Sequence, residues 1–200
     1  MQIEGSASDK RSERTCFTLA LEPPGNVARD LAAFRRSLFA VTGRSSYIFL
    51  PEIAPLAFVR RSPSFRASVS DLRRSVDEMW NGVEGNFSSG SVVASRGILY
   101  LEFSGPLKAL SARIREAAKV LEPCLSRRAP FEAGKGFFLG QALEPVSFPD
   151  PPRLSFRDCS LLLLRLDFSE EDFEAVSWRE IARAKRRTGP SDIPSRRERR

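Results

Sequence analysis

The sequence predicts an α+β fold with two related lobes, each a small antiparallel sheet with helices on its outer side. β-prone runs alternate with amphipathic helix patterns between residues 15 and 182. An apolar stretch at 47–59 is echoed in its second half by residues 135–143, which indicates two similar halves. The 200 residues are 42% hydrophobic and 28% charged, as in a globular chain large enough to bury a core.

The first half begins with a β-prone strand at 15–21. Asn26 is a helix N-cap, and the apolar residues after it recur on one helical face until Gly43, namely Val27, Leu31, Phe34 and Leu38. Strands follow at 47–50 and 56–59, separated by Pro51, which has no amide hydrogen for a ladder. Arg60 and Arg61 are predicted to lie in a loop, and residues 70–80 form a second helix.

The second half begins with a hairpin, with strands at 87–93 and 98–103. Pro106 opens a third helix that Pro123 ends, with apolar residues through Leu121 on its buried face. A strand at 135–143 and a proline-rich connection at 144–153 follow. The last hairpin is predicted to pair strands 160–168 and 173–181.

Charge divides the chain into a polar leader at 1–14, a folded domain at 15–182 and a basic, disordered tail at 183–200. The tail holds eight basic and two acidic residues, so it carries +6 of the formal net charge of +7. The leader has no apolar signal core, and no apolar run approaches the roughly 20 residues that span a bilayer. We therefore expect a cytoplasmic protein without a membrane span.

The order of these elements resembles the two-histidine (2H) phosphoesterase family, which includes the 2′-5′ RNA ligases and the RNA 2′,3′-cyclic phosphodiesterases. The segments CFTLALEPPGNVARDL and GILYLEFSGPLKALSARIREAA are similar to the family's opening strand and helix and to its second-lobe strand and helix. The resemblance implies two lobes of antiparallel sheet around a central cleft. It also implies a His-x-Thr/Ser motif on one cleft strand of each lobe.

Neither motif is present, because the chain contains no histidine. The resemblance places Pro55 and Ala57 at the first motif and Gly136 and Phe138 at the second, with Gln141 where an arginine often follows. Attack on a cyclic phosphate needs one group to accept a proton and another to donate one, and imidazole does both near neutral pH. The substituted residues do neither. The sequence therefore predicts a catalytically inactive relative that binds or scaffolds, with RNA ends or nucleotides as its ligands.

Two other functions stay open. An enzyme with rebuilt chemistry would use Glu52 or Lys135 after a large pKa shift. A partner-binding protein would use the basic tail. Candidate phosphate or nucleic-acid contacts are the arginines expected at the cleft rim and the basic residues of the tail, namely Arg60, Arg61, Arg127, Arg128, Lys185, Arg186 and Arg187. The sequence contains no P-loop and no pattern of zinc ligands, so no cofactor and no metal are expected.

Overall fold

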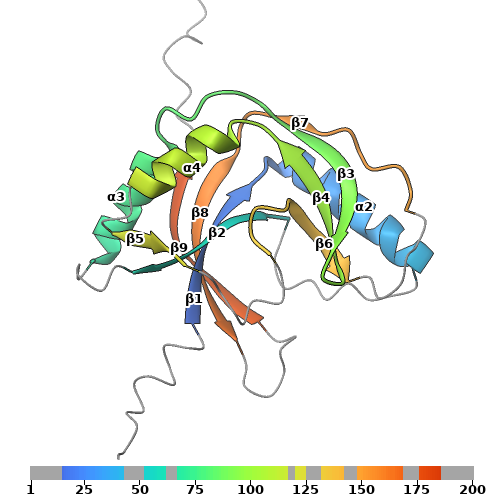
Figure 1. The fold of residues 1–200 in the computed structure, drawn as a ribbon. Helices are drawn as coiled ribbons and strands as arrows, with labels where there is room; N and C mark the ends of the chain where they lie inside the picture. Colours follow the sequence, from blue (N-terminus) through green and yellow to red (C-terminus); the bar gives the residue numbers. More distant parts are fainter. Residues whose placement is uncertain are drawn as a thin grey trace, which may run out of the picture.

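The computed structural model describes residues 15–42, 52–61, 67–116, 120–124, 132–141, 148–168 and 176–185. Its strands form two antiparallel sheets (Figure 1). The five-stranded sheet has the order β5-β2-β1-β8-β9, and the four-stranded sheet has the order β6-β4-β3-β7. The strands are β1 (Thr15–Glu22), β2 (Ala54–Arg61), β3 (Phe87–Ser95), β4 (Ile98–Ser104), β5 (Leu121–Pro123), β6 (Phe137–Gln141), β7 (Ser155–Phe156), β8 (Ser160–Phe168) and β9 (Val176–Lys185).

Strand β1 is the centre of the five-stranded sheet, because it pairs along its whole length with β8 and along most of it with β2. Leu19 lies opposite Leu163 on one side and opposite Ala57 on the other. Irregularities in the β1–β2 and β8–β9 ladders, the former between Leu19 and Ala20, shift which residues share a face.

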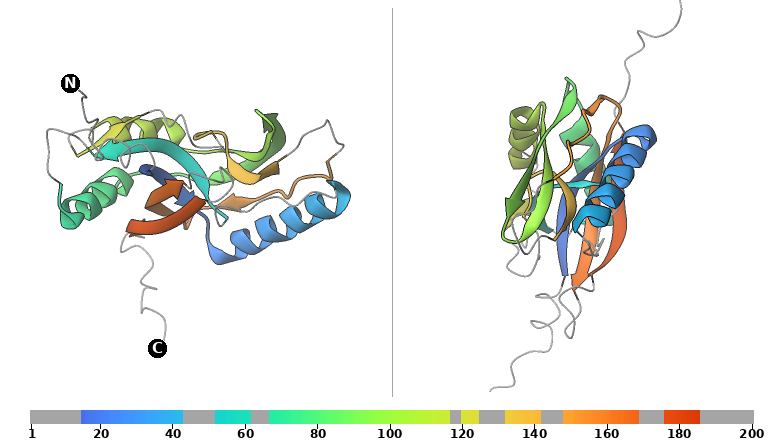
Figure 2. Two further views of the ribbon diagram at one scale, coloured as in Figure 1. Left: turned by 90° about the horizontal axis from the view of Figure 1, so that it is seen from below. Right: turned by 90° about the vertical axis from the view of Figure 1, so that its right-hand side faces the viewer.

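The helices are α2 (Gly25–Thr42), α3 (Val69–Trp80) and α4 (Leu107–Glu116). The apolar stripe predicted for α2 is buried, and the apolar residues Leu72, Val76, Met79 and Trp80 of α3 are buried too. A capping box fixes the start of α3: the Ser68 hydroxyl accepts from the Asp71 amide, and the Asp71 carboxylate accepts from the Ser68 amide. Helices α2 and α3 lie at opposite ends of the molecule (Figures 1 and 2).

Buried apolar residues form two clusters. The larger one, here called the outer cluster, contains the buried faces of all three helices together with one face of each sheet. The smaller one, here called the inner cluster, contains only residues of the two sheets and the residue before β2; its members are Ala20, Ile53, Phe58, Ile98, Tyr100, Phe138, Leu162, Leu164 and Leu166. The helices therefore cover the outer faces, and the inner faces pack directly on each other.

The predicted α+β fold, with two antiparallel sheets and outer helices, is confirmed. Strand 47–50 and the leader lie outside the described residues. Among the helices that the structure describes, none has the length and apolarity needed to cross a membrane.

Several boundaries predicted from the sequence are wrong. Helix α2 begins at Gly25, so Asn26 lies inside its first turn and is not the N-cap. Arg60 and Arg61 are the last residues of β2 and not a loop. Leu121 does not continue the third helix but begins β5, an edge strand that tolerates Pro123 because the proline sits at its end. Strand β9 runs to Lys185, four residues beyond the predicted end, because Ser160–Leu163 offer it partners that periodicity does not reveal. Residues 183–185 thus belong to the sheet, and only 186–200 follow it.

Candidate functional site

The two predicted cleft strands lie next to each other, one in each sheet. Strand β2 belongs to the five-stranded sheet and β6 to the four-stranded sheet. The amide of Gly134, just before β6, donates a 2.7 Å hydrogen bond to the carbonyl oxygen of Pro55. The two positions that the sequence assigned to the family motifs are therefore brought to one junction between the sheets.

Gly136 cannot carry a side chain in this backbone. Its φ is +140°, a conformation that residues with a Cβ rarely adopt. A Cβ built there would stand 2.2 Å from the Leu101 carbonyl oxygen and 2.8 Å from the Leu101 carbonyl carbon. Both atoms are backbone atoms of the paired strand β4, so they cannot rotate away. No imidazole fits at this position without a displacement of β6.

Phe138, which the sequence assigned to the second motif, is a buried ring. It is 2% exposed and packs edge to face on Tyr100, with ring centroids 6.4 Å apart. Both rings belong to the inner cluster, where leucines of β8 also pack. The sheet junction is thus filled with apolar side chains.

At the first motif the two assigned residues face opposite ways. Pro55 lies opposite Ala20, an inner-cluster residue, whereas Ala57 lies opposite Leu19 and packs against the outer cluster. The irregularity between Leu19 and Ala20 causes the change of face. Ile53, two residues before Pro55, is 1% exposed and also belongs to the inner cluster. Sequence reasoning missed it, although its spacing of two from Pro55 is the signal for a shared strand face.

A buried arginine on α2 reaches the junction. The Arg35 side chain is 3% exposed; its Nη1 contacts Glu52 Oε1 at 3.2 Å, and its Cζ lies 6.0 Å from the Phe138 ring centroid. Burial lowers the pKa of Arg35, and the Glu52 carboxylate opposes that shift. The sequence signal was the spacing of Arg35 four residues after Leu31, on the apolar side of the helix.

Two further titratable groups in or beside the inner cluster, a tyrosine and a cysteine, keep their protons at neutral pH. Burial raises the pKa of the Tyr100 hydroxyl, whose oxygen accepts a 2.7 Å hydrogen bond from the Glu132 amide. Burial also raises the pKa of the Cys124 thiol, against the opposing effect of Arg60. Neither group is poised to exchange a proton near pH 7.

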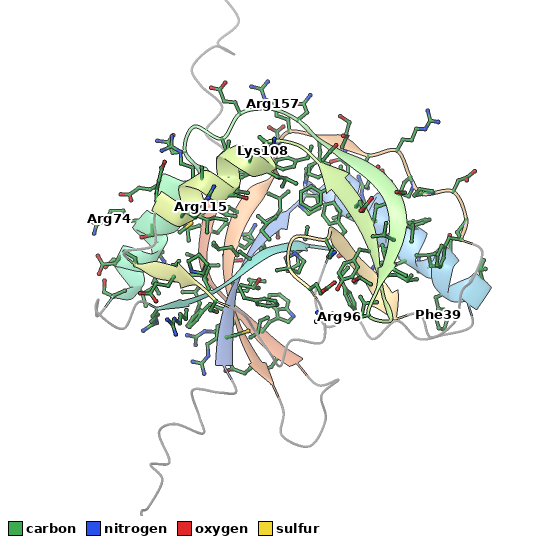
Figure 3. All side chains as sticks on the ribbon, in the orientation of Figure 1. Phe39, Arg74, Arg96, Lys108, Arg115 and Arg157 are labelled. Carbon is green, nitrogen blue, oxygen red and sulfur yellow. The ribbon has the colours of Figure 1, made fainter. Side chains whose placement is uncertain are left out.

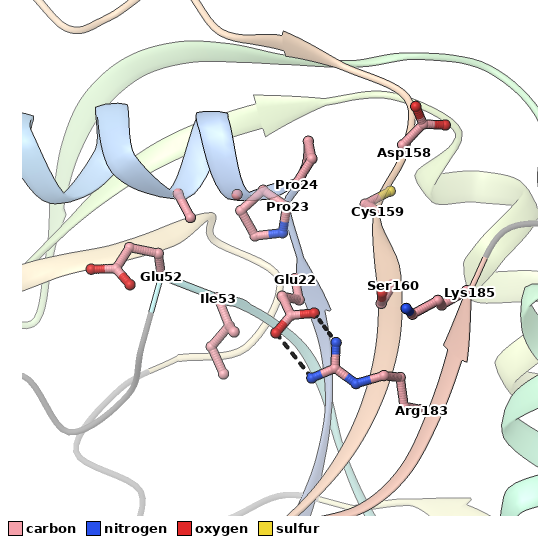
Figure 4. A pocket seen from close by; sticks show the side chains of 12 residues that line it. Glu22, Pro23, Pro24, Glu52, Ile53, Asp158, Cys159, Ser160, Arg183 and Lys185 are labelled. Carbon is pink, nitrogen blue, oxygen red and sulfur yellow. Dashed lines mark hydrogen bonds and ion pairs between the residues drawn. The ribbon is translucent and has the colours of Figure 1, made fainter.

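A hollow of about 530 Å³ remains at one end of the inner face, beside Ile53 (Figure 4). Its floor is a row across the five-stranded sheet, in which Glu22 lies opposite Ser160 and Ser160 opposite Lys185. The Arg183 guanidinium spans this floor and binds Glu22, with 3.0 Å from Nη2 to Oε1, and also Glu180, with 2.8 Å from Nη2 to Oε2. These carboxylates raise the pKa of Arg183.

Two of the carboxylates that line the hollow are therefore each held by an arginine: Glu22 by Arg183 and Glu52 by Arg35. Asp158 and Lys185 also line it, and no ion pair involves either of them within the described part of the chain. The hollow thus offers one ammonium group and one carboxylate to a ligand. No group of three metal-ligating side chains occurs among the described residues.

The remaining predicted contacts are scattered. Arg60 Nη2 lies 3.1 Å from Glu122 Oε2, and Arg61 stacks on Phe17, so these neighbours occupy opposite faces of β2. Lys185 belongs to β9 and lines the hollow. The other predicted contacts, Arg127, Arg128, Arg186 and Arg187, lie outside the described residues.

No family model and no curated protein matches the sequence. The structure is similar to the crystal structure of E. coli LigT complexed with 3′-AMP. LigT is a 2′-5′ RNA ligase of the 2H phosphoesterase class. The match has a TM-score of 0.52 and 14% sequence identity, and it covers 86% of this chain and 98% of LigT. The chain has a LigT-like fold.

Proposed function

We propose that this protein is a catalytically inactive relative of the 2H phosphoesterases that binds nucleotides or RNA ends. The observation that carries the proposal is the packing at the sheet junction. Gly136 has no room for a side chain, and Phe138, Ile53 and Pro55 present only apolar atoms. Proton transfer to and from a phosphate ester has no donor–acceptor pair there.

The hollow beside the junction is the proposed ligand site. Lys185 supplies a cation for a phosphate, and Ile53, Pro23 and Pro24 supply apolar surface for a base. The similar LigT structure holds 3′-AMP, which makes a nucleotide the first ligand to test. Because Glu22 and Glu52 are engaged by arginines, they repel a phosphate less than free carboxylates would.

A calorimetric titration with 3′-AMP tests binding, and incubation with adenosine 2′,3′-cyclic phosphate followed by chromatography tests turnover. We expect one bound 3′-AMP per chain and no hydrolysis above a heat-treated control. Lys185→Ala should weaken binding several-fold, whereas Lys108→Ala, at an exposed lysine of α4 (Figure 3), should not. Absence of binding by the unmodified protein at low salt contradicts the proposal.

The alternative enzyme would use Glu52, which lines the hollow. Its contact with Arg35 keeps that carboxylate in place beside the hollow, where it would serve as the proton-transfer group of such an enzyme. Hydrolysis that persists through independent purifications and disappears in Glu52→Gln would support this alternative. Hydrolysis that instead requires Lys135 would support the second rebuilt mechanism that the sequence left open.

A further inference from the structure

We propose that the outer face of the five-stranded sheet, at the end where β1 begins, binds the phosphates of a single-stranded nucleic acid. Three arginines carry the proposal, and we call them the outer arginine row: Arg61, Arg165 and Arg179. The row lies on the face opposite the inner cluster. It therefore goes beyond the nucleotide site proposed above and does not depend on it.

Strand register places the row across four consecutive strands. Phe17 of β1 lies opposite Arg165 of β8, and Arg165 lies opposite Arg179 of β9. Arg61, at the end of β2, places its Cζ 5.6 Å from the centroid of the Phe17 ring. Adjacent strands are about 4.8 Å apart, so the row extends roughly 14 Å from β2 to β9.

The row carries a surplus of positive charge. Asp167 binds Arg165, with 2.9 Å from Nη2 to Oδ1, and both side chains are about two-fifths exposed, at 39% and 43%. No carboxylate pairs with Arg61 or Arg179 among the described residues. Counted over the described residues alone, three guanidinium groups and one carboxylate leave the row a charge of +2. Like charges directly opposite each other destabilise a sheet, so Arg165 and Arg179 do not stabilise the fold through each other.

The length of the row favours the binding of an extended anion over that of a single phosphate. A single phosphate would reach two of the arginines at most, whereas a chain of phosphates crossing the strands would reach all three. The guanidinium group donates two parallel hydrogen bonds to a phosphate, and every cation in the row is an arginine. A phosphodiester backbone offers one such acceptor per nucleotide, which favours it over an acidic peptide with carboxylates on flexible stems.

The test uses the full chain and a fluorescein-labelled 12-nucleotide oligouridylate, with binding followed by anisotropy from 50 to 300 mM salt. The test variant is R61Q/R165Q/R179Q. The matched control is R29Q/R36Q/R153Q, which removes the same charge from exposed arginines of α2 and of the segment before β7. Circular dichroism melting of both variants separates loss of binding from loss of folding.

We expect the test variant to bind about tenfold more weakly at 50 mM salt, with a log–log salt slope smaller by roughly 2, because each single-strand phosphate contact contributes about 0.7. In the control variant, both the loss of affinity and the decrease of the salt slope should be less than half as large. The melting temperature of the test variant should not fall, since like-charge repulsion is relieved. Equal binding by test and control variants overturns the proposal, as does an unmodified protein that does not bind at 50 mM salt. Displacement by polyglutamate as effective as by unlabelled oligouridylate also overturns it, in favour of an acidic protein partner.

Discussion

Replacing Gly136 with alanine tests whether the second motif position is closed to side chains. The new Cβ would lie 2.2 Å from the Leu101 carbonyl oxygen, whereas real Cβ contacts stay beyond 3.0 Å, so β6 has to move by nearly 1 Å relative to β4. The φ of +140° adds backbone strain of about 1–3 kcal/mol. Because this strain adds to the disturbed pairing between β6 and β4, we expect the free energy of unfolding to fall by about 3 kcal/mol or more.

Two other glycines provide a graded control. Gly134 has a φ of +80°, but the nearest atom to its Cβ would be 3.6 Å away, so Gly134→Ala should cost only the conformational strain, about 1–2 kcal/mol. Gly25 has no atom within 4 Å of a built Cβ and no positive φ, so Gly25→Ala should change stability by less than about 1 kcal/mol.

Urea denaturation, followed by circular dichroism and tryptophan fluorescence, measures all three variants. A Gly136→Ala variant no less stable than Gly134→Ala would refute the close approach to β4. The second motif position would then have room for a side chain, and the main steric argument for inactivity would be lost.

Three further predictions concern the inner face and the chain end. Glu52→Gln leaves the buried Arg35 guanidinium without its carboxylate and should lower the free energy of unfolding by about 1–3 kcal/mol in urea denaturation; an unchanged midpoint would contradict the pairing. Burial raises the folded-state pKa of Tyr100, so its contribution to stability is complete below pH 10 and is lost as the pH rises further; Tyr100→Phe should flatten the decline of the melting temperature between pH 9 and 11. Deleting 186–200 should leave the melting temperature unchanged, whereas a deletion that begins at Arg183 should lower it, because β9 loses its end and Glu22 loses its arginine.

The elements with a strong local pattern were predictable from the sequence. Strand β8 is a run of leucines with two charged residues only near its end, and the stripe of α2 repeats at helical spacing. Burial of one face or of both faces of an element produces such a pattern, so the local sequence is enough to predict the element. The order of these elements also identified the correct fold, even though the match to LigT has only 14% identity.

The site was less predictable because its details depend on pairing between distant segments. The irregularity beside Leu19 decides that Ala57 faces outward, and no local pattern in β2 contains that information. Helical spacing places Arg35 on the apolar side of α2, but only the approach of β6 places it over Phe138. The same reason explains β5 and the end of β9, which are strands because a partner strand is present beside them.

The two proposed binding surfaces are separated by the geometry of β1. Glu22, at the hollow, and Phe17, beneath the outer arginine row, are five residues apart on this strand, which is roughly 17 Å. They also point to opposite faces, since Glu22 shares a face with Ala20 and Phe17 packs with the outer cluster. A mononucleotide cannot touch both surfaces, and sites this far apart without a shared partner contribute to binding independently. Loss of Lys185 should therefore weaken 3′-AMP binding while leaving the salt slope for oligouridylate unchanged, and loss of the outer arginine row should do the reverse.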